Sequence, residues 1–436
     1  MIVGLGKTGL SCARYLYGPG ARLAVMDDNP SPALLPALSS ISTEIPFGPI
    51  EAARLLEARE IVLSPGVPRR LPAIARALQA GVPVTCDVAM FTEVADQPVV
   101  AITGSNGKST VTALTGELAR TVGLRPGVGG NIGTPCLDLL GQDSNIYVLE
   151  VSSYQLETAT HPRCKVGVVL NLSPDHQDRY PDTETYYRTK AAIYSACEIA
   201  VINRGIDFDF GVPPVSRVSF GDDAPASSQD FGFEDEGGRT YIVRGSNRLI
   251  DVSELAMRGR HNHLNAMAAL AIGDSLGWDM DAMLAALRTF RGLPHRCEFF
   301  ASVEGVSFIN DSKSTNVGST LAAVRGFAGE EGNLFLILGG QAKGADFSLL
   351  RAAVSGHVQS VYVFGVDREH IVRGLGQSIA VQAFESLPEV LAEVRRSARS
   401  GDVVLFSPAC ASFDQYRNFE DRGDRFKALV LGEARL

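Results

Sequence analysis

The residues best suited to chemistry lie between positions 104 and 110 and read Gly104, Ser105, Asn106, Gly107, Lys108, Ser109 and Thr110. An apolar run at 99–102 precedes them, and a helical pattern at 112–120 follows. A strand, a glycine-rich turn and a helix opening with Lys-Ser/Thr form the arrangement that cradles polyphosphates. Backbone N–H groups and Lys108 would meet the phosphates, and a hydroxyl of Ser109 or Thr110 could hold Mg²⁺. The stretch therefore predicts ATP binding.

This loop is shorter than the usual phosphate-binding motif, because Ile102 stands where the motif has its first glycine. The alternative interpretation is a glycine-rich turn with a solvated lysine. The strand and the helix on either side favour the phosphate loop.

Three further polar residues follow apolar runs or sit in a helical pattern of the central region. Glu150 ends a predicted buried strand, where an acid beside a phosphate loop can hold Mg²⁺. A helix N-cap or a surface acid is the alternative. His176 follows the strand predicted at 166–170 and is either a metal ligand or a structural histidine. Lys190 lies in a helical segment at 186–194, and this position by itself predicts a solvated surface lysine.

Near the C-terminus, three predicted strands each end in a polar cluster. The clusters span residues 310–316, 339–346 and 407–415 and supply hydroxyls and cations. Because ligands bind at the carboxyl ends of parallel strands, these clusters predict a site for an anionic small molecule. Capped loops are the alternative for each cluster taken alone.

Alternating strand and helix patterns predict an α/β protein of three domains, at 1–95, 96–294 and 295–436. The first domain opens with Gly4, Gly6 and Gly9 in the GxGxxG register and has Asp27 after its second strand. That is a dinucleotide fingerprint, but it fits equally a Rossmann-like lobe that binds something other than NAD. Residues 205–250 predict a small antiparallel excursion.

Composition narrows the classes of partner. The 436 residues are 45% hydrophobic and carry a net charge of −9, which disfavours nucleic acid and acidic membranes as partners. We find no signal-peptide pattern and no apolar run long enough to span a bilayer. The seven cysteines are scattered without metal-ligand spacing, as expected for reduced thiols of a cytoplasmic protein.

Taken together, the motifs resemble those of the Mur ligase family over essentially the whole chain. The resemblance rests on the stretches 104–110, 129–133, 149–153, 175–180 (with Asp178), 259–266, 293–296, 310–316 and 407–419. It implies a Rossmann-like N-terminal lobe, a central phosphate-loop domain with a mainly parallel sheet, and a Rossmann-like C-terminal domain. The C-terminal stretches are most similar to those of members that add D-glutamate.

The resemblance implies an ATP-dependent ligase that joins D-glutamate to UDP-N-acetylmuramoyl-L-alanine through an acyl phosphate in peptidoglycan synthesis. It further implies two Mg²⁺ ions, no nucleic acid, no membrane insertion, and a monomer. A carboxylate becomes a good electrophile only when phosphate provides a leaving group, and cations must gather the mutually repelling anions.

Residue roles follow from the same resemblance. Catalysis would fall to Lys108, His176, Lys190 (as a carbamate) and Lys313, and the metal ligands would be Ser109, Glu150, His176 and Lys190. ATP would contact the 104–110 loop together with Asn262, Asn265, His295, Arg296, Asp311 and Lys313. The substrates would contact Thr8, Asp27, Asn131, Thr315, Lys343, Ser412, Phe413 and Phe419.

Two alternatives remain open from the sequence. One is a related ligase that adds another amino acid or extends a folate. The other is an NAD-binding regulatory protein with an ATPase module, supported by the GxGxxG register and Asp27.

Overall fold

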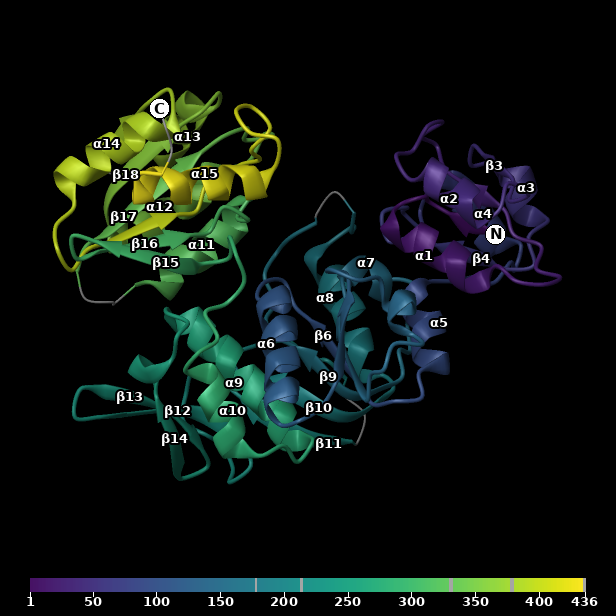
Figure 1. Cartoon of the computed structure of the whole chain (residues 1–436), viewed down its shortest axis with the longest axis horizontal. Coiled ribbons are helices and arrows are strands. Elements are labelled where there is room, and N and C mark those ends of the chain that lie inside the picture. Colours follow the sequence, from purple (N-terminus) through teal and green to yellow (C-terminus); the bar gives the residue numbers. More distant parts are fainter. Residues whose placement is uncertain (177–178, 212–214, 329–331, 377–379, 434–436) are drawn as a thin grey trace. The chain divides into compact units, whose positions relative to one another are not determined.

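A computed structural model gives the fold of the chain and describes residues 1–176, 179–211, 215–328, 332–376 and 380–433. The strands form three sheets and helices alternate with them along the chain, which confirms the predicted α/β class (Figure 1). The chain divides into two compact units, one of residues 1–232, 244–246 and 268–283 and the other of 233–243, 247–267 and 284–436. Asp178 lies outside the described residues.

The first sheet is parallel and has the order β3-β2-β1-β4-β5. Its strands are β1 (Ile2–Val3), β2 (Val25–Met26), β3 (Phe47–Gly48), β4 (Ile61–Leu63) and β5 (Val84–Thr85). The helices are α1 (Lys7–Leu16), α2 (Leu35–Ile41), α3 (Ala52–Leu56), α4 (Pro72–Gln79) and α5 (Asp87–Val94). Successive strand residues point to opposite faces, so Ile2 packs with Leu10 of α1 whereas Val3 packs with Ile74 of α4.

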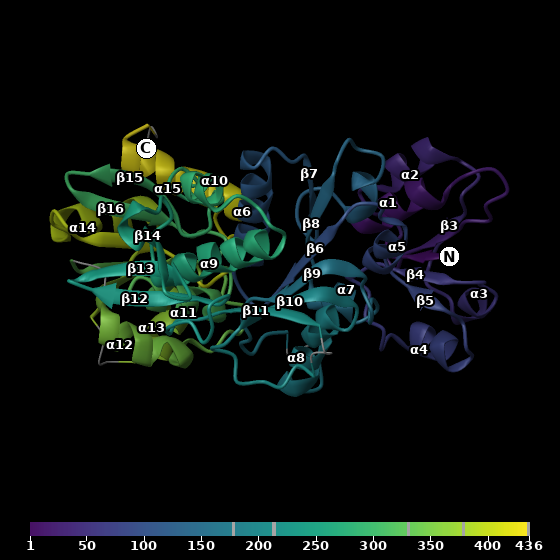
Figure 2. The same ribbon diagram turned by 90° about the horizontal axis from the view of Figure 1, so that it is seen from below.

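The central sheet has nine strands in the order β14-β13-β12-β11-β10-β9-β6-β8-β7. They are β6 (Val99–Thr103), β7 (Pro126–Gly130), β8 (Ile146–Glu150), β9 (Cys164–Val169), β10 (Cys197–Asn203), β11 (Ser216–Phe220), β12 (Phe231–Glu236), β13 (Arg239–Arg244) and β14 (Asn247–Asp251). Its helical segments are α6 (Lys108–Thr121), η1 (Cys136–Leu139), α7 (Ser153–Leu156), α8 (Thr183–Ala191), η2 (Ala192–Tyr194), η3 (Val252–Glu254), α9 (Arg260–Ser275) and α10 (Met280–Leu287). Figure 2 shows β7, β8, β6, β9, β10 and β11 side by side in this order.

The predicted antiparallel excursion at 205–250 is only partly right. The prediction is wrong for β11, which pairs in parallel with β10 and at Phe220–Phe231 with β12. The chain between β10 and β11 is long enough for a parallel crossover, whereas the two-residue turn between β12 and β13 can join only antiparallel strands. That turn has Gly237 and Gly238 at φ 60° and 79°, the combination that a type I′ hairpin requires.

The third sheet has the order β15-β16-β20-β17-β18-β19, and only β15 runs antiparallel to its neighbour. Its strands are β15 (Glu298–Val303), β16 (Val306–Asn310), β17 (Leu334–Gly339), β18 (Val358–Phe364), β19 (Val381–Ala383) and β20 (Val403–Phe406). The helical segments are α11 (Val317–Gly326), η4 (Phe347–Leu350), α12 (Arg351–His357), α13 (Arg368–Leu375), α14 (Leu387–Ser397) and α15 (Phe419–Leu431).

Helices cover both faces of this third sheet. On one face Leu336 and Leu405 pack with residues of α11, α12 and α13. On the other face Ile337 and Phe406 pack with residues of α14 and α15. With both faces buried, the strands read as continuous apolar runs, and only their ends are available to polar groups. These ends carry the three polar clusters found in the sequence.

Candidate active site

The phosphate loop joins β6 to α6, and the segment after β9 holds it through Asn171 and Ser173. Asn171 follows β9; its carbonyl accepts the N–H of Ser105 at 3.0 Å and its Oδ1 accepts the N–H of Asn106 at 2.8 Å. Gly104 and Gly107 adopt φ values of 154° and 80°, which a side chain would strain. The loop therefore has a fixed shape, and α6 begins at Lys108, with its N-terminus directed at the loop.

Ser109, Glu150 and Asn131 meet beside this loop. The Ser109 hydroxyl donates to Glu150 Oε2 at 2.5 Å, and Asn131 Nδ2 donates to Glu150 Oε1 at 2.7 Å. Glu150 is the last residue of β8 and Asn131 directly follows β7, so adjacent parallel strands bring them together. Glu150 is buried, which makes its carboxylate an oriented group rather than a solvated one.

Two lysines converge on one carbonyl oxygen. Lys108 Nζ lies 2.9 Å and Lys190 Nζ 2.8 Å from the carbonyl oxygen of Gly104. Lys190 is buried, with 1% of its surface exposed, so the expectation of a solvated lysine at this position is wrong. Burial, and next the charge of Lys108, hold the pKa of Lys190 well below its ordinary value. The site thus favours a neutral Lys190 amine.

His176 has an aromatic and hydroxyl partner that the sequence did not indicate. Its Nδ1 lies 2.8 Å from the Tyr154 hydroxyl, and its φ of 53° is a left-handed conformation. The Arg179 guanidinium covers the Tyr154 ring at 4.6 Å and binds Glu157 Oε2 at 2.7 Å. The ring of Tyr186 lies 5.9 Å from the His176 ring and 4.7 Å from Lys190 Nζ. His176 and Lys190 therefore flank one tyrosine.

In the N-terminal lobe, Asp27 serves the glycine turn that follows β1. Its Oδ2 accepts the N–H of Leu5 at 2.6 Å and its Oδ1 accepts the N–H of Asn29 at 2.8 Å. Thr8 lies in the first turn of α1, directly after this turn. The strand order places this edge at the point where the chain switches direction across the sheet, which is where such lobes bind ligands.

In the second unit, the three predicted polar clusters do meet at one edge of the third sheet. Ser407 Oγ donates to Asp311 Oδ2 at 2.7 Å, and Gln341 exchanges two backbone hydrogen bonds with Ala411. Asp311 also accepts the hydroxyl of Ser314 and the N–H of Cys297, and burial raises the pKa of Asp311. Its carboxyl group thus ties loops of its own domain together.

Two lysines of this edge lie over phenylalanine rings. Lys313 Nζ lies 4.0 Å from the centroid of Phe419, and Lys343 Nζ lies 5.4 Å from that of Phe413. Both distances are within cation–π range. Lys343 adopts φ 50°, and the Phe413 side chain is exposed, with a relative accessibility of 65%.

The other predicted site residues of the second unit differ in how far they are exposed to solvent. Ser412 is buried, whereas Thr315 is exposed. Asn262 and Asn265 lie near the start of α9, where Asn265 Nδ2 donates to Asn262 Oδ1 at 3.2 Å. His295 and Arg296 precede β15, with His295 buried at φ 63°.

Two further residues organise these loops, and the sequence assigned neither of them a role. Asn171 holds the phosphate loop, and its only sequence signal was its place after an apolar strand. Arg422 of α15 is completely buried and donates to Ser312 Oγ at 3.0 Å, to the carbonyl of Cys410 at 2.9 Å and to that of Gly339 at 3.3 Å. A helical arginine carries no sequence signal for such burial.

Two features are absent from the described ranges. These ranges contain no group of three or more His, Cys, Asp or Glu side chains placed to hold a metal ion. They also contain no helix with the length and apolarity needed to cross a bilayer.

The phosphate loop in a three-sheet α/β architecture defines a nucleotide-binding enzyme. Family models match three parts of the chain: "Mur ligase MurD-like, N-terminal domain" residues 1–86, "Mur ligase middle domain" residues 102–273, and "Mur ligase, glutamate ligase domain" residues 295–410. A protein of Marinobacter nauticus named UDP-N-acetylmuramoylalanine--D-glutamate ligase is 45% identical, covering 99% of this chain and 98% of that protein. One of the same name from Hahella chejuensis is 43% identical, covering 98% and 97%.

Solved structures share the fold at low sequence identity. UDP-N-acetylmuramate-alanine ligase MurC of Thermotoga maritima gives a TM-score of 0.58 at 20% identity and covers 99% of both chains. MurF ligase of Thermotoga maritima, solved in complex with ADP, gives 0.59 at 19% identity, covering 88% of this chain and 96% of that one. The chain belongs to the Mur ligase family, and it is an ATP-dependent ligase that forms amide bonds.

Proposed function

We propose that this chain joins D-glutamate to UDP-N-acetylmuramoyl-L-alanine, with ATP converted to ADP and phosphate, in peptidoglycan synthesis. The observation that carries the proposal is the 45% identity to a D-glutamate ligase over 99% of the chain. The phosphate loop with its buried Glu150 and Lys190 is the geometry that the chemistry needs.

The reaction has two bond-forming steps. The alanyl carboxylate attacks the γ-phosphorus of ATP, which forms an acyl phosphate and releases ADP. The amine of D-glutamate then attacks the acyl carbon, the C–O bond to phosphate breaks, and the amine loses a proton as the amide forms. Each step brings anions together, so fixed cations and backbone N–H groups lower the barrier.

In the central domain, Lys108 and the loop residues Gly104, Ser105, Asn106, Gly107, Ser109 and Thr110 would hold the phosphates of ATP. Asn131 would contact the muramoyl substrate beside Glu150. Their support is the loop geometry and the 2.7 Å contact between Asn131 and Glu150.

Mg²⁺ fits the oxygen donors of this site. Ser109 Oγ and Glu150 Oε2 are hard ligands 2.5 Å apart, and Mg²⁺ in such sites takes its remaining ligands from substrate phosphates and water. We propose Ser109 and Glu150 for one ion, and His176 and Lys190 for a second. When bound, the ions would neutralise phosphate charge.

For Lys190 we propose carbamylation. The neutral amine attacks CO₂, an N–C bond forms, and a proton leaves, so that a cation becomes a carboxylate-like anion. The support is the burial of Lys190 and its position beside Lys108 at the Gly104 carbonyl. An anion there offsets the charge of Lys108 and supplies oxygen to Mg²⁺.

The remaining roles are assigned by motif. Thr8 and Asp27 would bind the uridine end of the substrate. Asn262, Asn265, His295, Arg296, Asp311 and Lys313 would serve ATP, with Lys313 also catalytic, and Thr315, Lys343, Ser412, Phe413 and Phe419 would receive D-glutamate. We further propose domains at 1–95, 96–294 and 295–436, a monomer, and a cytoplasmic location.

A phosphate-release assay tests the function. ATP and UDP-N-acetylmuramoyl-L-alanine are supplied with D-glutamate, L-glutamate, L-lysine or L-alanine in parallel. We expect release with D-glutamate alone, and a product of the mass of the D-glutamyl amide. Release that depends on another amino acid, with D-glutamate inert, would point to a different ligase of the superfamily.

A titration addresses the NAD-binding alternative. The full chain is titrated with UDP and with NADH while intrinsic fluorescence is followed. Binding of UDP without binding of NADH is expected, whereas tight NADH binding with no response to UDP would favour the regulatory protein.

A further inference from the structure

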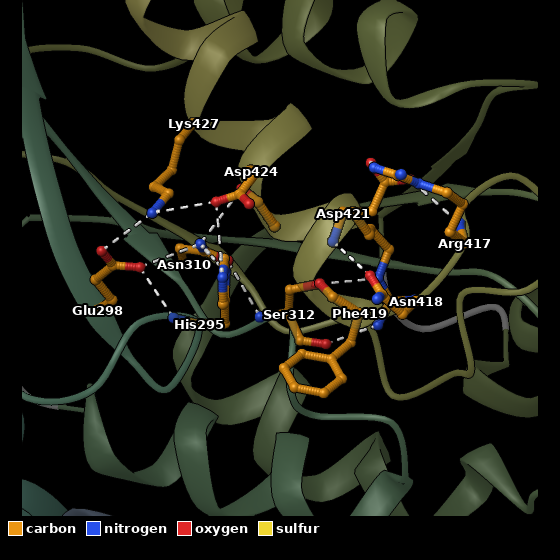
Figure 3. Close-up of polar contacts among 12 residues, drawn as sticks. His295, Glu298, Asn310, Ser312, Arg417, Asn418, Phe419, Asp421, Asp424 and Lys427 are labelled. Atoms are coloured by element: carbon orange, nitrogen blue, oxygen red, sulfur yellow. Dashed lines mark hydrogen bonds and ion pairs between the residues drawn. The ribbon is translucent and has the colours of Figure 1, made fainter. Parts of the chain in front are cut away.

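Asn310, the last residue of β16, is completely buried beside His295 (Figure 3). Its side-chain Nδ2 lies 3.0 Å from His295 Nδ1, 3.3 Å from Glu298 Oε2 and 3.4 Å from the carbonyl oxygen of Gly423. Its Oδ1 accepts the backbone N–H of Ser312 at 3.2 Å. One amide therefore contacts four residues of the second unit.

The orientation of this amide follows from its unambiguous neighbours. The N–H of Ser312 can only donate, so the atom facing it must be the amide oxygen. The carbonyl of Gly423 can only accept, so the atom facing it must be the NH₂ group. The NH₂ group is also the end that faces the imidazole of His295.

An NH₂ group that faces Nδ1 requires a lone pair there. Nδ1 of His295 must accept, and in a neutral imidazole the single hydrogen then lies on Nε2. Resting on the nucleotide role proposed for His295, we infer that Asn310 is a positioning residue that holds His295 as its Nε2–H tautomer. His295 would then offer the nucleotide one N–H donor, suited to a phosphate or ribose oxygen.

The charges around the ring are consistent with a neutral imidazole. Burial, and next the charge of Lys427, lower the pKa of His295, against the opposite effects of Asp424, Glu298 and Glu420. Asp424 Oδ1 lies 3.7 Å from His295 Nε2 and belongs to a mostly exposed side chain. The Nε2 side of the ring thus faces a hydrogen-bond acceptor already, which agrees with a hydrogen on Nε2.

Space for this pair depends on a glycine in α15. A Cβ at Gly423 would stand 2.2 Å from His295 Nδ1, on the side where Asn310 donates. Any side chain there would push the ring away from the amide. Gly423→Ala therefore displaces the imidazole without changing the chemistry of Asn310.

Nitrogen NMR of the full chain labelled with ¹⁵N-histidine tests the inference without any ligand. The seven histidines give separable ring signals, and His295→Gln identifies that of His295. We expect a pyridine-type Nδ1 and a pyrrole-type Nε2 at pH 7.5. A pyrrole-type Nδ1 in the unaltered protein would overturn the inference.

Asn310→Asp replaces the amide with a carboxylate of nearly the same shape. A carboxylate accepts where the amide donated, so Nδ1 should gain a hydrogen and the affinity for ATP should fall about tenfold, as for one misplaced hydrogen bond. Asn247→Asp, the same charge change at an exposed position of β14, should alter neither. Gly423→Ala should weaken ATP binding and let both tautomers be populated, because the displaced ring loses the amide contact that keeps Nδ1 an acceptor.

The outcomes separate this inference from the proposed function. An unchanged tautomer in folded Asn310→Asp would contradict the positioning role, whatever the enzyme catalyses. The expected tautomer together with ATP binding but no phosphate release with D-glutamate would leave the inference intact and contradict the proposed function.

Discussion

At the scale of single residues, three of the residues proposed for function have an unfavourable backbone geometry. His176, His295 and Lys343 are among the few non-glycine residues with positive φ, at 53°, 63° and 50°. Such conformations cost energy and persist only where the surroundings enforce them. All three belong to motifs that the sequence singled out. The geometry is therefore independent support for the site proposed here.

Lys190→Ala is expected to abolish most of the ligase activity. Removal of a buried ligand-forming group costs about 100-fold or more in turnover, measured as phosphate release at saturating ATP. Lys165→Ala is the control, because Lys165 makes an exposed ion pair with Glu198.

The carbamate itself can be detected separately. Full chain incubated with ¹³C-bicarbonate should show a carbamate carbon signal that Lys190→Ala lacks. Full activity in the variant, or an identical signal from it, would contradict the assignment of this role to Lys190.

At the scale of elements, the site depends on loops that side chains from other elements hold. Asn171 fixes the phosphate loop from the end of β9, and Arg422 of α15 fixes three loops of the third sheet through carbonyl and hydroxyl oxygens. Parallel strands place these loops at one edge, and the buried polar groups then fix their conformations.

Arg422→Met should destabilise the protein by about 2–4 kcal/mol. The methionine fills much of the volume, but Ser312 and the carbonyls of Gly339 and Cys410 lose their buried donors. Thermal unfolding followed by circular dichroism measures the change. Arg417→Met, at an exposed position in the segment that precedes α15, should leave the midpoint within error. Equal midpoints for the two variants would contradict the loop-holding role.

Gly9→Ala tests the contact between β1 and α1. A Cβ at Gly9 would stand 1.9 Å from the carbonyl oxygen of Gly4, so the helix must move away from the strand. We expect a loss of about 1–3 kcal/mol and a raised KM for the uridine substrate, despite the better helix propensity of alanine.

Gly6→Ala is the matched control in the same turn. A Cβ at Gly6 meets nothing within 4 Å, and its φ is −89°. Loss of stability or affinity equal to that of Gly9→Ala would show that the turn merely needs glycine rather than close packing.

At the scale of the whole molecule, buried histidines link stability to pH. Both ring nitrogens of His261 are buried and lack a hydrogen-bond partner among the described residues, and the ring lies against Phe327. Burial lowers the pKa of His261 from 6.5 to about 4. Between these values the unfolded chain binds a proton that the folded chain does not.

Above pH 6.5 the neutral His261 does not lower the free energy of unfolding. As the pH falls toward 4, the free energy of unfolding decreases, because only the unfolded chain binds the proton. The loss at pH 4 is about 3 kcal/mol for a shift of this size. Unfolding midpoints of the unaltered chain and His261→Phe, measured from pH 7.5 to 4.5, should converge or cross as the pH falls. The exposed His357→Gln should follow the unaltered chain throughout. Parallel curves for His261→Phe would contradict this prediction.

The sequence by itself determined the fold class, the family, and the positions of the polar motifs. Continuous apolar runs predicted strands buried on both faces, and the glycine loop with Lys108 and Ser109 predicted the phosphate loop, because these signals are local along the chain. Helix and strand bounds shifted by a few residues, since the ends of elements depend on capping and packing.

Only the tertiary structure decided which side chains meet and in what chemical state. The sequence placed Lys190 in an ordinary helix, whereas packing against the phosphate loop buries its amine beside Lys108. It placed Asn310 at a strand end, whereas the N–H of Ser312 and the carbonyl of Gly423 fix the direction of its amide. The parallel β11 and the burial of Arg422 were likewise beyond the sequence. Burial, hydrogen-bond direction and pKa arise from neighbours distant in sequence, and no local pattern encodes them.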